Sequence, residues 1–214
     1  MTRTAADKKN DLIESLAIHA DPPFLEQGFK RSKRSLSYVQ KFERAKQTLA
    51  VHFDSLRSDG TTDEIRISPS ISLMMPELVP VSLSLIGGNK LLLANAPEVL
   101  LNQPISLCMP EQRQGSWYAV DTEEISVRVK EFVTFSSDWV FDFLAKLRTP
   151  EDLLHLYETG DPRVMFQQHS YIHLAAAAYV VRGPQEALNI VQKHFASAGT
   201  KRRFQAAHDY LGEL

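Results

Sequence analysis

The sequence predicts an α+β fold, in which an antiparallel meander of four or more strands is covered on one face by helices and followed by a C-terminal helical bundle. Two patterns support this prediction. Between residues 36 and 85, apolar residues recur at every second position in four runs, which is typical of strands with one buried face. From residue 122 onward they recur at helical spacing. We therefore expect a helix and the sheet in residues 1–121, and helices in residues 122–214 that pack on them to form one continuous unit.

The four runs predict which side chains face the core. The inward positions of successive runs are Leu36, Tyr38 and Phe42; Leu49, Val51 and Phe53; Ile65, Ile67, Ile71, Leu73 and Met75; and Val79, Val81, Leu83 and Leu85. The links are short, which favours antiparallel neighbours, because a parallel crossover needs about a dozen residues or more. Turn residues at Ser58-Asp59-Gly60 separate the second run from the third. Pro69 has no N–H group, so it is expected at a sheet edge or a bulge.

Helices and shorter strands surround these runs. Residues 4–19 have helical spacing, and Asp21-Pro22-Pro23 ends that helix and begins a short one that Gly28 stops. The stretch from Lys90 to Pro110 contains two segments that fit strands, residues 91–93 and 105–109, and residues 116–120 fit another. Helices are expected from Thr122, and again after Thr149, where a cap, a proline and two acids follow one another.

The C-terminal part is predicted to centre on a buried helix. Residues 171–181 are apolar nearly all round, and Gly183-Pro184 separates them from a return helix over residues 184–196. A last helix is expected over residues 201–211. The spacing of small and apolar residues in the first two helices is similar to that of one tetratricopeptide hairpin. A repeat array would need about three such hairpins to bury a core, so we expect a single hairpin.

Composition bounds the class of protein. The chain has 214 residues, 43% hydrophobic and 23% charged, and its net charge is −2. Residues 1–60 hold 11 Lys/Arg and 8 Asp/Glu (+3), and the remainder holds 13 and 18 (−5). Cys108 is the one cysteine, which excludes an internal disulfide and Cys-based zinc sites. The first ten residues lack the apolar region of a signal peptide. We expect a cytoplasmic protein without a membrane segment, and the oligomeric state stays open.

A second resemblance covers most of the chain. Residues 24–30, Phe-Leu-Glu-Gln-Gly-Phe-Lys, lead into basic residues and the sheet, and residues 115–121, Gly-Ser-Trp-Tyr-Ala-Val-Asp, precede the helices. This order resembles a bacterial family known as domain of unknown function forty-three-oh-four, although Tyr118 stands where that family has a second tryptophan. The resemblance implies no catalytic residue. Similar small α+β domains occur as immunity proteins beside bacterial toxins, which is an analogy of fold.

Several chemical motifs were weighed and set aside. His169 and His173 have the spacing of two metal ligands on one helix face, but no third ligand accompanies them. Cys108 lies among apolar neighbours, as inert cysteines do. Five carboxylates lie at predicted helix starts, where acidic side chains interact favourably with the helix dipole: Asp121, Glu123, Glu124, Glu151 and Asp152. The loop of residues 87–90 lacks the Walker spacing. We therefore expect no catalytic residue, no metal ligand and no cofactor.

The basic stretch of residues 30–46 is the most distinctive feature. Residues 28–58 hold 8 Lys/Arg against 2 Asp/Glu. The alternation turns Arg31, Lys33, Lys41, His52 and Arg66 outward, together with serines at residues 35, 37, 68, 70, 72, 82 and 84. We expect these five residues to bind a protein partner, either an acidic one or a toxin, so that the chain is a non-enzymatic binding module such as a bacterial immunity or antitoxin protein. Two alternatives remain: a nucleic-acid-associated protein that uses the basic strand, and a small hydrolase whose groups converge from distant positions.

Overall fold

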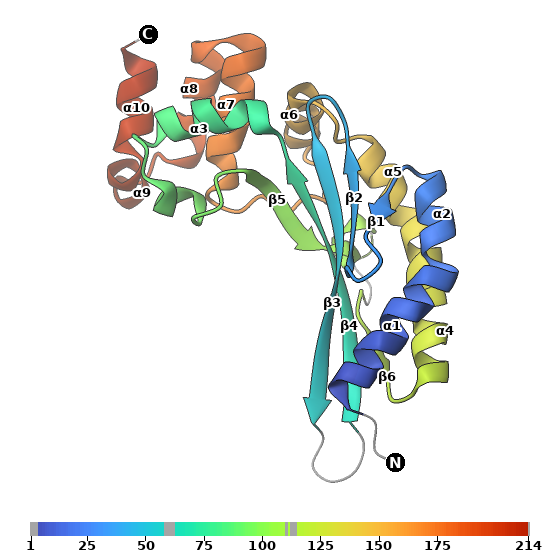
Figure 1. Cartoon of the computed structure of the whole chain (residues 1–214). Coiled ribbons are helices and arrows are strands. Elements are labelled where there is room, and N and C mark those ends of the chain that lie inside the picture. Colours follow the sequence, from blue (N-terminus) through green and yellow to red (C-terminus); the bar gives the residue numbers. More distant parts are fainter. Residues whose placement is uncertain (1–3, 58–62, 110, 112–114, 214) are drawn as a thin grey trace. The chain divides into compact units, whose positions relative to one another are not determined.

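The computed structural model describes residues 4–57, 63–109, 111 and 115–213, and it confirms the α+β class (Figure 1). The turn predicted at residues 58–60 lies outside these residues. The strands follow one another through the sheet in chain order from β1 to β5, and β6 pairs with β4. They are β1 (Lys30–Arg31), β2 (Ser37–Lys41), β3 (Lys46–Arg57), β4 (Asp63–Met74), β5 (Val99–Pro104) and β6 (Trp117–Ala119).

The chain forms two compact units, each built from three stretches of sequence. Unit 1 contains residues 1–41, 47–72 and 102–145, and unit 2 contains residues 42–46, 73–101 and 146–214. The boundary expected at residue 121 does not separate them. The reason is that the helix beginning at Thr122 packs on β6 and on the N-terminal helix, within unit 1.

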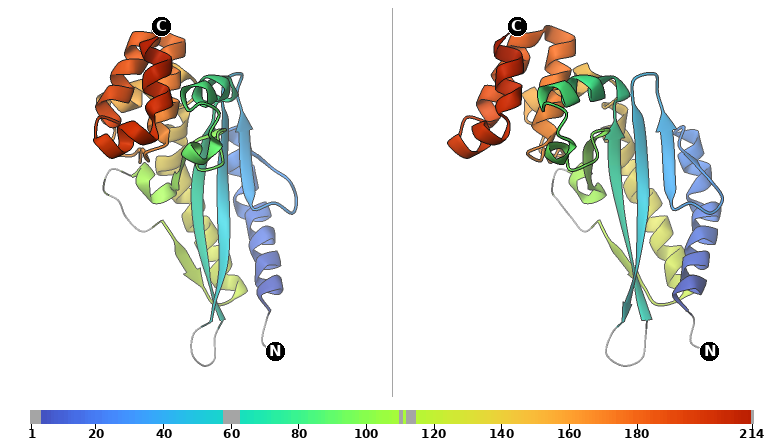
Figure 2. Two further views of the ribbon diagram at one scale, coloured as in Figure 1. Left: turned by 90° about the vertical axis from the view of Figure 1, so that its left-hand side faces the viewer. Right: turned by 60° about the vertical axis from the view of Figure 1, so that its left-hand side comes forward.

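Unit 1 is a sheet with helices on one face. Its helices are α1 (Ala5–His19), α2 (Asp21–Glu26), α4 (Thr122–Phe135) and α5 (Phe141–Ala145), with a 3-10 turn at Ile105–Cys108 (η3) and a π-helical turn at Ser136–Val140 (η4). Figure 2 shows β3 and β4 in front of α1 and α4. The core between the two layers contains Phe24, whose ring centroid lies 4.5 Å from that of Tyr38 and 5.5 Å from that of Phe132. The inward positions predicted for β2, β3 and β4 are largely confirmed, since Tyr38, Leu49, Val51, Ile65 and Ile67 are buried.

The fourth predicted strand is wrong. Residues 79–85 form a helix, α3 (Val79–Leu85), with Pro80 in its first turn, where a missing N–H costs nothing. The buried residues here are Leu78, Ser82, Leu85 and Ile86, which is helical spacing. Ser82, expected outward, is therefore inside. Pro69 lies within β4 just beyond the residues that pair with β6, so its missing N–H removes no bond to that strand.

Unit 2 is a helical bundle around a buried helix. Its helices are α3, α6 (Pro150–Thr159), α7 (Ser170–Arg182), α8 (Pro184–His194), α9 (Ala198–Arg203) and α10 (Gln205–Gly212), with 3-10 turns at Pro76–Leu78 (η1) and Lys90–Leu93 (η2). The helix α7 packs against α3, α6 and α8, and its residues 172–178 are all buried. The central helix and the single hairpin are thus confirmed. Two segments expected as strands, residues 91–93 and 105–109, are 3-10 turns instead, and β5 lies between them.

Candidate functional site

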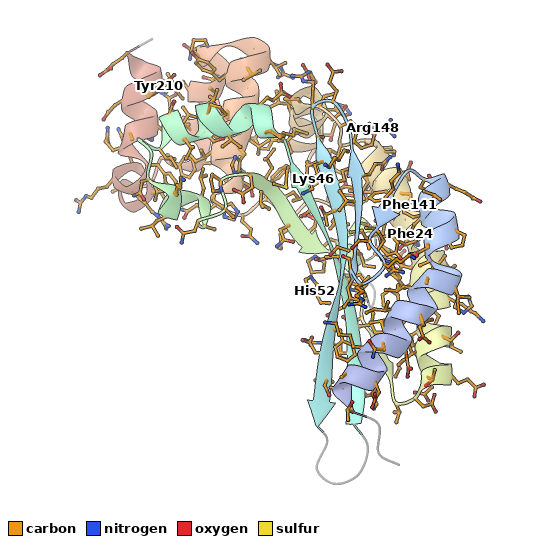
Figure 3. All side chains as sticks on the ribbon, viewed as in Figure 1. Phe24, Lys46, His52, Phe141, Arg148 and Tyr210 are labelled. Carbon is orange, nitrogen blue, oxygen red and sulfur yellow. The ribbon has the colours of Figure 1, made fainter. Side chains whose placement is uncertain are left out.

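The face of the unit 1 sheet opposite to its helices holds most of the residues predicted to bind a partner (Figure 2). We define this open face by the side chains of β2, β3 and β4 that alternate with the buried ones: Ser37, Val39, Lys41, Thr48, Ala50, His52, Asp54, Arg66, Ser68, Ser70 and Ser72. Each is half-buried or exposed. Figure 3 places His52 on the side of β3 opposite to Phe24 and Phe141, which lie in the helix-covered core. Tyr118 joins the open face, because it is the direct cross-strand neighbour of Arg66.

Arg31 does not belong to this face. It pairs across the ladder with Tyr38, so the two side chains share the face that the helices cover. Its side chain is only 1% exposed. The Nε and Nη2 groups of Arg31 each donate to the Asp21 carboxylate at 2.8 Å, and the Tyr38 hydroxyl donates to the same carboxylate at 2.8 Å. Burial, and then the hydrogen bond to Asp21, raises the pKa of Tyr38 above its ordinary range. The predicted outward position of Arg31 is therefore wrong, since the turn between β1 and β2 shifts the alternation.

The other charged groups of the open face are held in place by their neighbours. The Arg66 guanidinium donates to the Asp54 carboxylate at 2.7 and 3.1 Å, and these bonds raise the pKa of Arg66. A ring nitrogen of His52 lies 2.8 Å from the Ser70 hydroxyl. Because β3 and β4 fix both pairs side by side, these side chains lose little freedom when a surface binds over them.

Exposed cations lie on β1, on β2 and in the turn between them. Lys30, Lys33, Arg34 and Lys41 are exposed, and no residue in the described part of the chain forms an ion pair with them. Lys30 lies opposite Val39 in the ladder and so shares its face. Within the same basic stretch, Arg44 differs, because it pairs with Glu77 and Glu151 in unit 2. Tyr38 is buried on the other side of the sheet and offers no stacking ring there, whereas Tyr118, which shares the face of Arg66, is 39% exposed.

Serine–histidine pairs recur in the structure, which bears on the hydrolase alternative. The contacts are His19–Ser126 at 2.9 Å, His52–Ser70 at 2.8 Å and Ser82–His173 at 3.0 Å. A catalytic serine also needs a group that orients the far ring nitrogen. Over the described ranges, no carboxylate bonds to that nitrogen in any of the three pairs. His52–Ser70 is an exposed pair, whereas Ser82 and His173 are fully buried in unit 2.

The structure places the remaining candidates within helical elements or at the start of helices. His169 precedes α7, and His173 points into the core toward Ser82. The described part of the chain contains no group of three or more His, Cys, Asp or Glu placed to hold a metal ion. Asp121 caps α4, and Asp152 completes a capping box with Thr149 at the start of α6. Cys108 is buried in η3. Nor does any helix among the described residues have the length and apolar character that spanning a membrane takes.

A second surface of unit 1 was missed by the sequence reasoning. A shallow groove of about 540 Å³ lies on α4, η4 and the neighbouring β6. Its apolar lining is Trp117, Val127, Phe135 and Trp139, and its polar lining is Lys130, Glu131, Thr134 and Asp138. Trp117 packs edge-on against Phe135, with ring centroids 5.9 Å apart. The sequence contains only these two tryptophans. The helical pattern of the sequence does not predict the groove, because the π-helical turn rotates Trp139 relative to a regular helix.

The edge of β6 beside this groove is closed by side chains of α4. The Arg128 guanidinium donates to the Tyr118 carbonyl at 3.0 Å and to Glu131. The Glu124 carboxylate accepts from the Val120 N–H at 2.8 Å. These bonds satisfy backbone groups that an edge strand otherwise offers to another chain.

Comparison of the chain with protein families, with curated proteins and with solved structures finds no match. The resemblance to the bacterial family of unknown function therefore stays a prediction, as does the function as an immunity protein that it suggested.

Proposed function

We propose that this chain is a non-enzymatic protein-binding module and that its partner docks on the open face. The observation that carries the proposal is that this face has small side chains and lies opposite to the helices of unit 1 (Figure 2). Seven of its positions are serine, threonine, alanine or valine, and the described elements of unit 1 place their helices on the opposite side (Figure 2). Small side chains held by a ladder lose little conformational entropy on binding, so a broad surface of this kind favours association.

The chemistry of the face favours an acidic partner. Within the face, Asp54 pairs with Arg66, so among the described residues the unpaired positive charge comes from Lys41 of the face and from the exposed Lys30, Lys33 and Arg34 at β1 and the turn that follows it. Fixed positive charge beside such a face steers an acidic protein and mainly raises its rate of association. The narrower form of the proposal is a cytoplasmic immunity or antitoxin protein that covers an acidic surface of a toxin. It is supported by the analogy with small α+β immunity domains.

The test uses the full chain as bait in extracts of its own host. Wild-type protein is compared with Lys33→Glu/Lys41→Glu, which reverses two of these exposed positive charges, and with Ser70→Arg, which places bulk at the centre of the face. The matched control is Lys9→Glu, which makes one of the same reversals on an exposed position of α1. We expect a partner that the wild type and the control capture and that both face variants lose, with the loss in the lysine variant shrinking at high salt.

The site itself is then mapped by hydrogen exchange of the purified complex. Binding should protect β3 and β4, and circular dichroism should show that each variant is folded. Equal capture by wild type and both face variants would overturn the proposal. The narrower form is tested by co-expression with the product of the neighbouring gene, where rescue of growth by the wild type but not by Ser70→Arg is the expected outcome.

A further inference from the structure

The tryptophan groove carries two charges that have no partner among the residues that the structure describes. Lys130 and Asp138 both line it and are both exposed. In the described ranges, neither forms an ion pair or a hydrogen bond. The other two charged side chains nearby, Arg128 and Glu131, satisfy each other through two contacts of 2.9 and 3.1 Å. Within the described part of the chain, the groove thus has one unpaired cation and one unpaired anion.

These two charges are placed symmetrically about Thr134. Lys130 precedes Thr134 by four residues and Asp138 follows it by four, and all three line the same groove. At about 1.5 Å per residue, Lys130 lies roughly 6 Å before the small Thr134 along α4, and Asp138 lies beyond Thr134 in the π-helical turn. Turning such a patch by 180° about an axis through Thr134 exchanges the positions of the positive and the negative charge. The patch is therefore complementary to a copy of itself.

From this symmetry we propose that the groove binds a second copy of this chain in a two-fold dimer. The helices α4 and η4 of the two copies cross antiparallel at Thr134, so that Lys130 of each copy faces Asp138 of the other. A closed two-fold interface uses one patch twice, so a single self-complementary stripe provides two ion pairs. A small residue at the crossing point lets two helix axes approach to about 8–10 Å.

The apolar lining gives this contact its driving force. Val127 is 45% exposed, and it lies on the same stripe as Phe135 and Trp139. Tryptophan is the residue type most enriched among those that dominate binding energy at interfaces, and covering it removes apolar surface from water. The ion pairs at the two ends then fix the register and the antiparallel orientation. This surface is separate from the open face, so the inference does not depend on the proposed function.

A charge-swap experiment on the full chain tests the inference. Sedimentation equilibrium gives the dissociation constant of the dimer for wild type, Lys130→Asp, Asp138→Lys and the double swap Lys130→Asp/Asp138→Lys. Each single variant places like charges opposite each other twice, and we expect its dissociation constant to rise by more than about tenfold. The double swap restores opposite charges and should bring the constant back to within about threefold of the wild type. Lys9→Asp, which changes the same charge on α1, should leave it unchanged.

The fluorescence of the protein reports on the same event independently. Because both tryptophans of the chain line the groove, their emission should move to shorter wavelength as the wild-type concentration rises through the dissociation constant. Lys130→Asp should lose this dependence at the same concentrations and keep the circular dichroism of the folded chain. A wild type that stays monomeric at all concentrations would refute the inference. So would a dimer that is insensitive to the single charge changes, or one that the double swap fails to restore.

Discussion

The buried imidazole of His173 makes a quantitative prediction about the acid stability of unit 2. His173 is 1% exposed, one ring nitrogen lies 3.0 Å from the Ser82 hydroxyl, and the other, Nε2, has no hydrogen-bond partner. Burial, with a smaller contribution from the nearby His169, lowers the pKa of His173 from 6.5 to about 3. The folded protein therefore holds this imidazole neutral, while the unfolded chain takes up a proton near pH 6.5.

The sign and size of the effect follow from this difference. Above pH 6.5 both states are neutral at this site and the group has no effect on the free energy of unfolding. As the pH falls toward 3, only the unfolded chain binds the proton, so folding becomes less favourable. Each pH unit in that window costs about 1.4 kcal/mol, which gives a loss of about 2 kcal/mol at pH 5 and about 5 kcal/mol once the pH falls below 3.

Urea unfolding followed by helical circular dichroism, at several pH values between 7 and 4, measures the loss. The informative variant is His173→Phe/Ser82→Ala, which removes the titrating group without leaving a buried hydroxyl alone. Its free energy of unfolding should fall by about 2 kcal/mol less than that of wild type between pH 7 and pH 5. Ser82→Ala alone keeps the buried imidazole and should keep the wild-type slope. If the double variant and wild type lose stability in parallel, His173 is not held neutral by burial.

Two further substitutions test the packing. Ala178→Leu enlarges a side chain that is 1% exposed in α7 and should lower the free energy of unfolding by about 1–3 kcal/mol, whereas Val180→Leu on the exposed side of the same helix should cost little. An unchanged denaturation midpoint in Ala178→Leu would contradict the buried position of α7. Gly28→Ala should destabilise unit 1 by more than about 1 kcal/mol, because Gly28 has a φ of +86° and an added Cβ would lie 2.7 Å from the Gln40 side-chain nitrogen. Gly199→Ala, with open space around it and no positive φ, is the control, and equal melting temperatures for the two variants would contradict this reasoning.

Much of the fold could be predicted because alternation and helix signals are local. Leu49, Val51, Ile65 and Ile67 alternate over strands long enough to be distinctive, and Thr149-Pro150 marks the start of α6 with a cap that the structure contains. The stretch of residues 79–85 shows where this reasoning fails. Its apolar residues fit a two-residue period, but the stretch is only two helical turns long. It forms the helix α3 because this conformation buries Leu78, Leu85 and Ile86, which lie at helical spacing.

The candidate site was harder to predict because it depends on contacts between distant residues. Arg31 is removed from the open face by Asp21, ten residues earlier, and by a register with Tyr38 that the alternation of β2 does not specify. The tryptophan groove joins Trp117 to Trp139 through packing on α4, and the π-helical turn that turns Trp139 toward it has no sequence signature. Local patterns specify which face of a strand is exposed to solvent. They do not specify which of the exposed residues already form contacts within the protein.

The division of the chain into interleaved stretches also governs how the protein can be made. Because unit 1 needs residues 102–145 as well as the hairpins before residue 72, a chain cut at residue 101 has its strands β2 to β4 but lacks the helix α4 that lies over them. During synthesis, the strands β2 to β4 are made well before the helix that covers them. The 73 residues from 72 to 145 take roughly 4 to 15 seconds to add at 5–20 residues per second, and for that time Leu49, Ile65 and Ile67 lack part of their cover. Until α4 is complete, the nascent chain therefore exposes apolar strand surface that α4 later covers, and we expect chaperone binding in that interval.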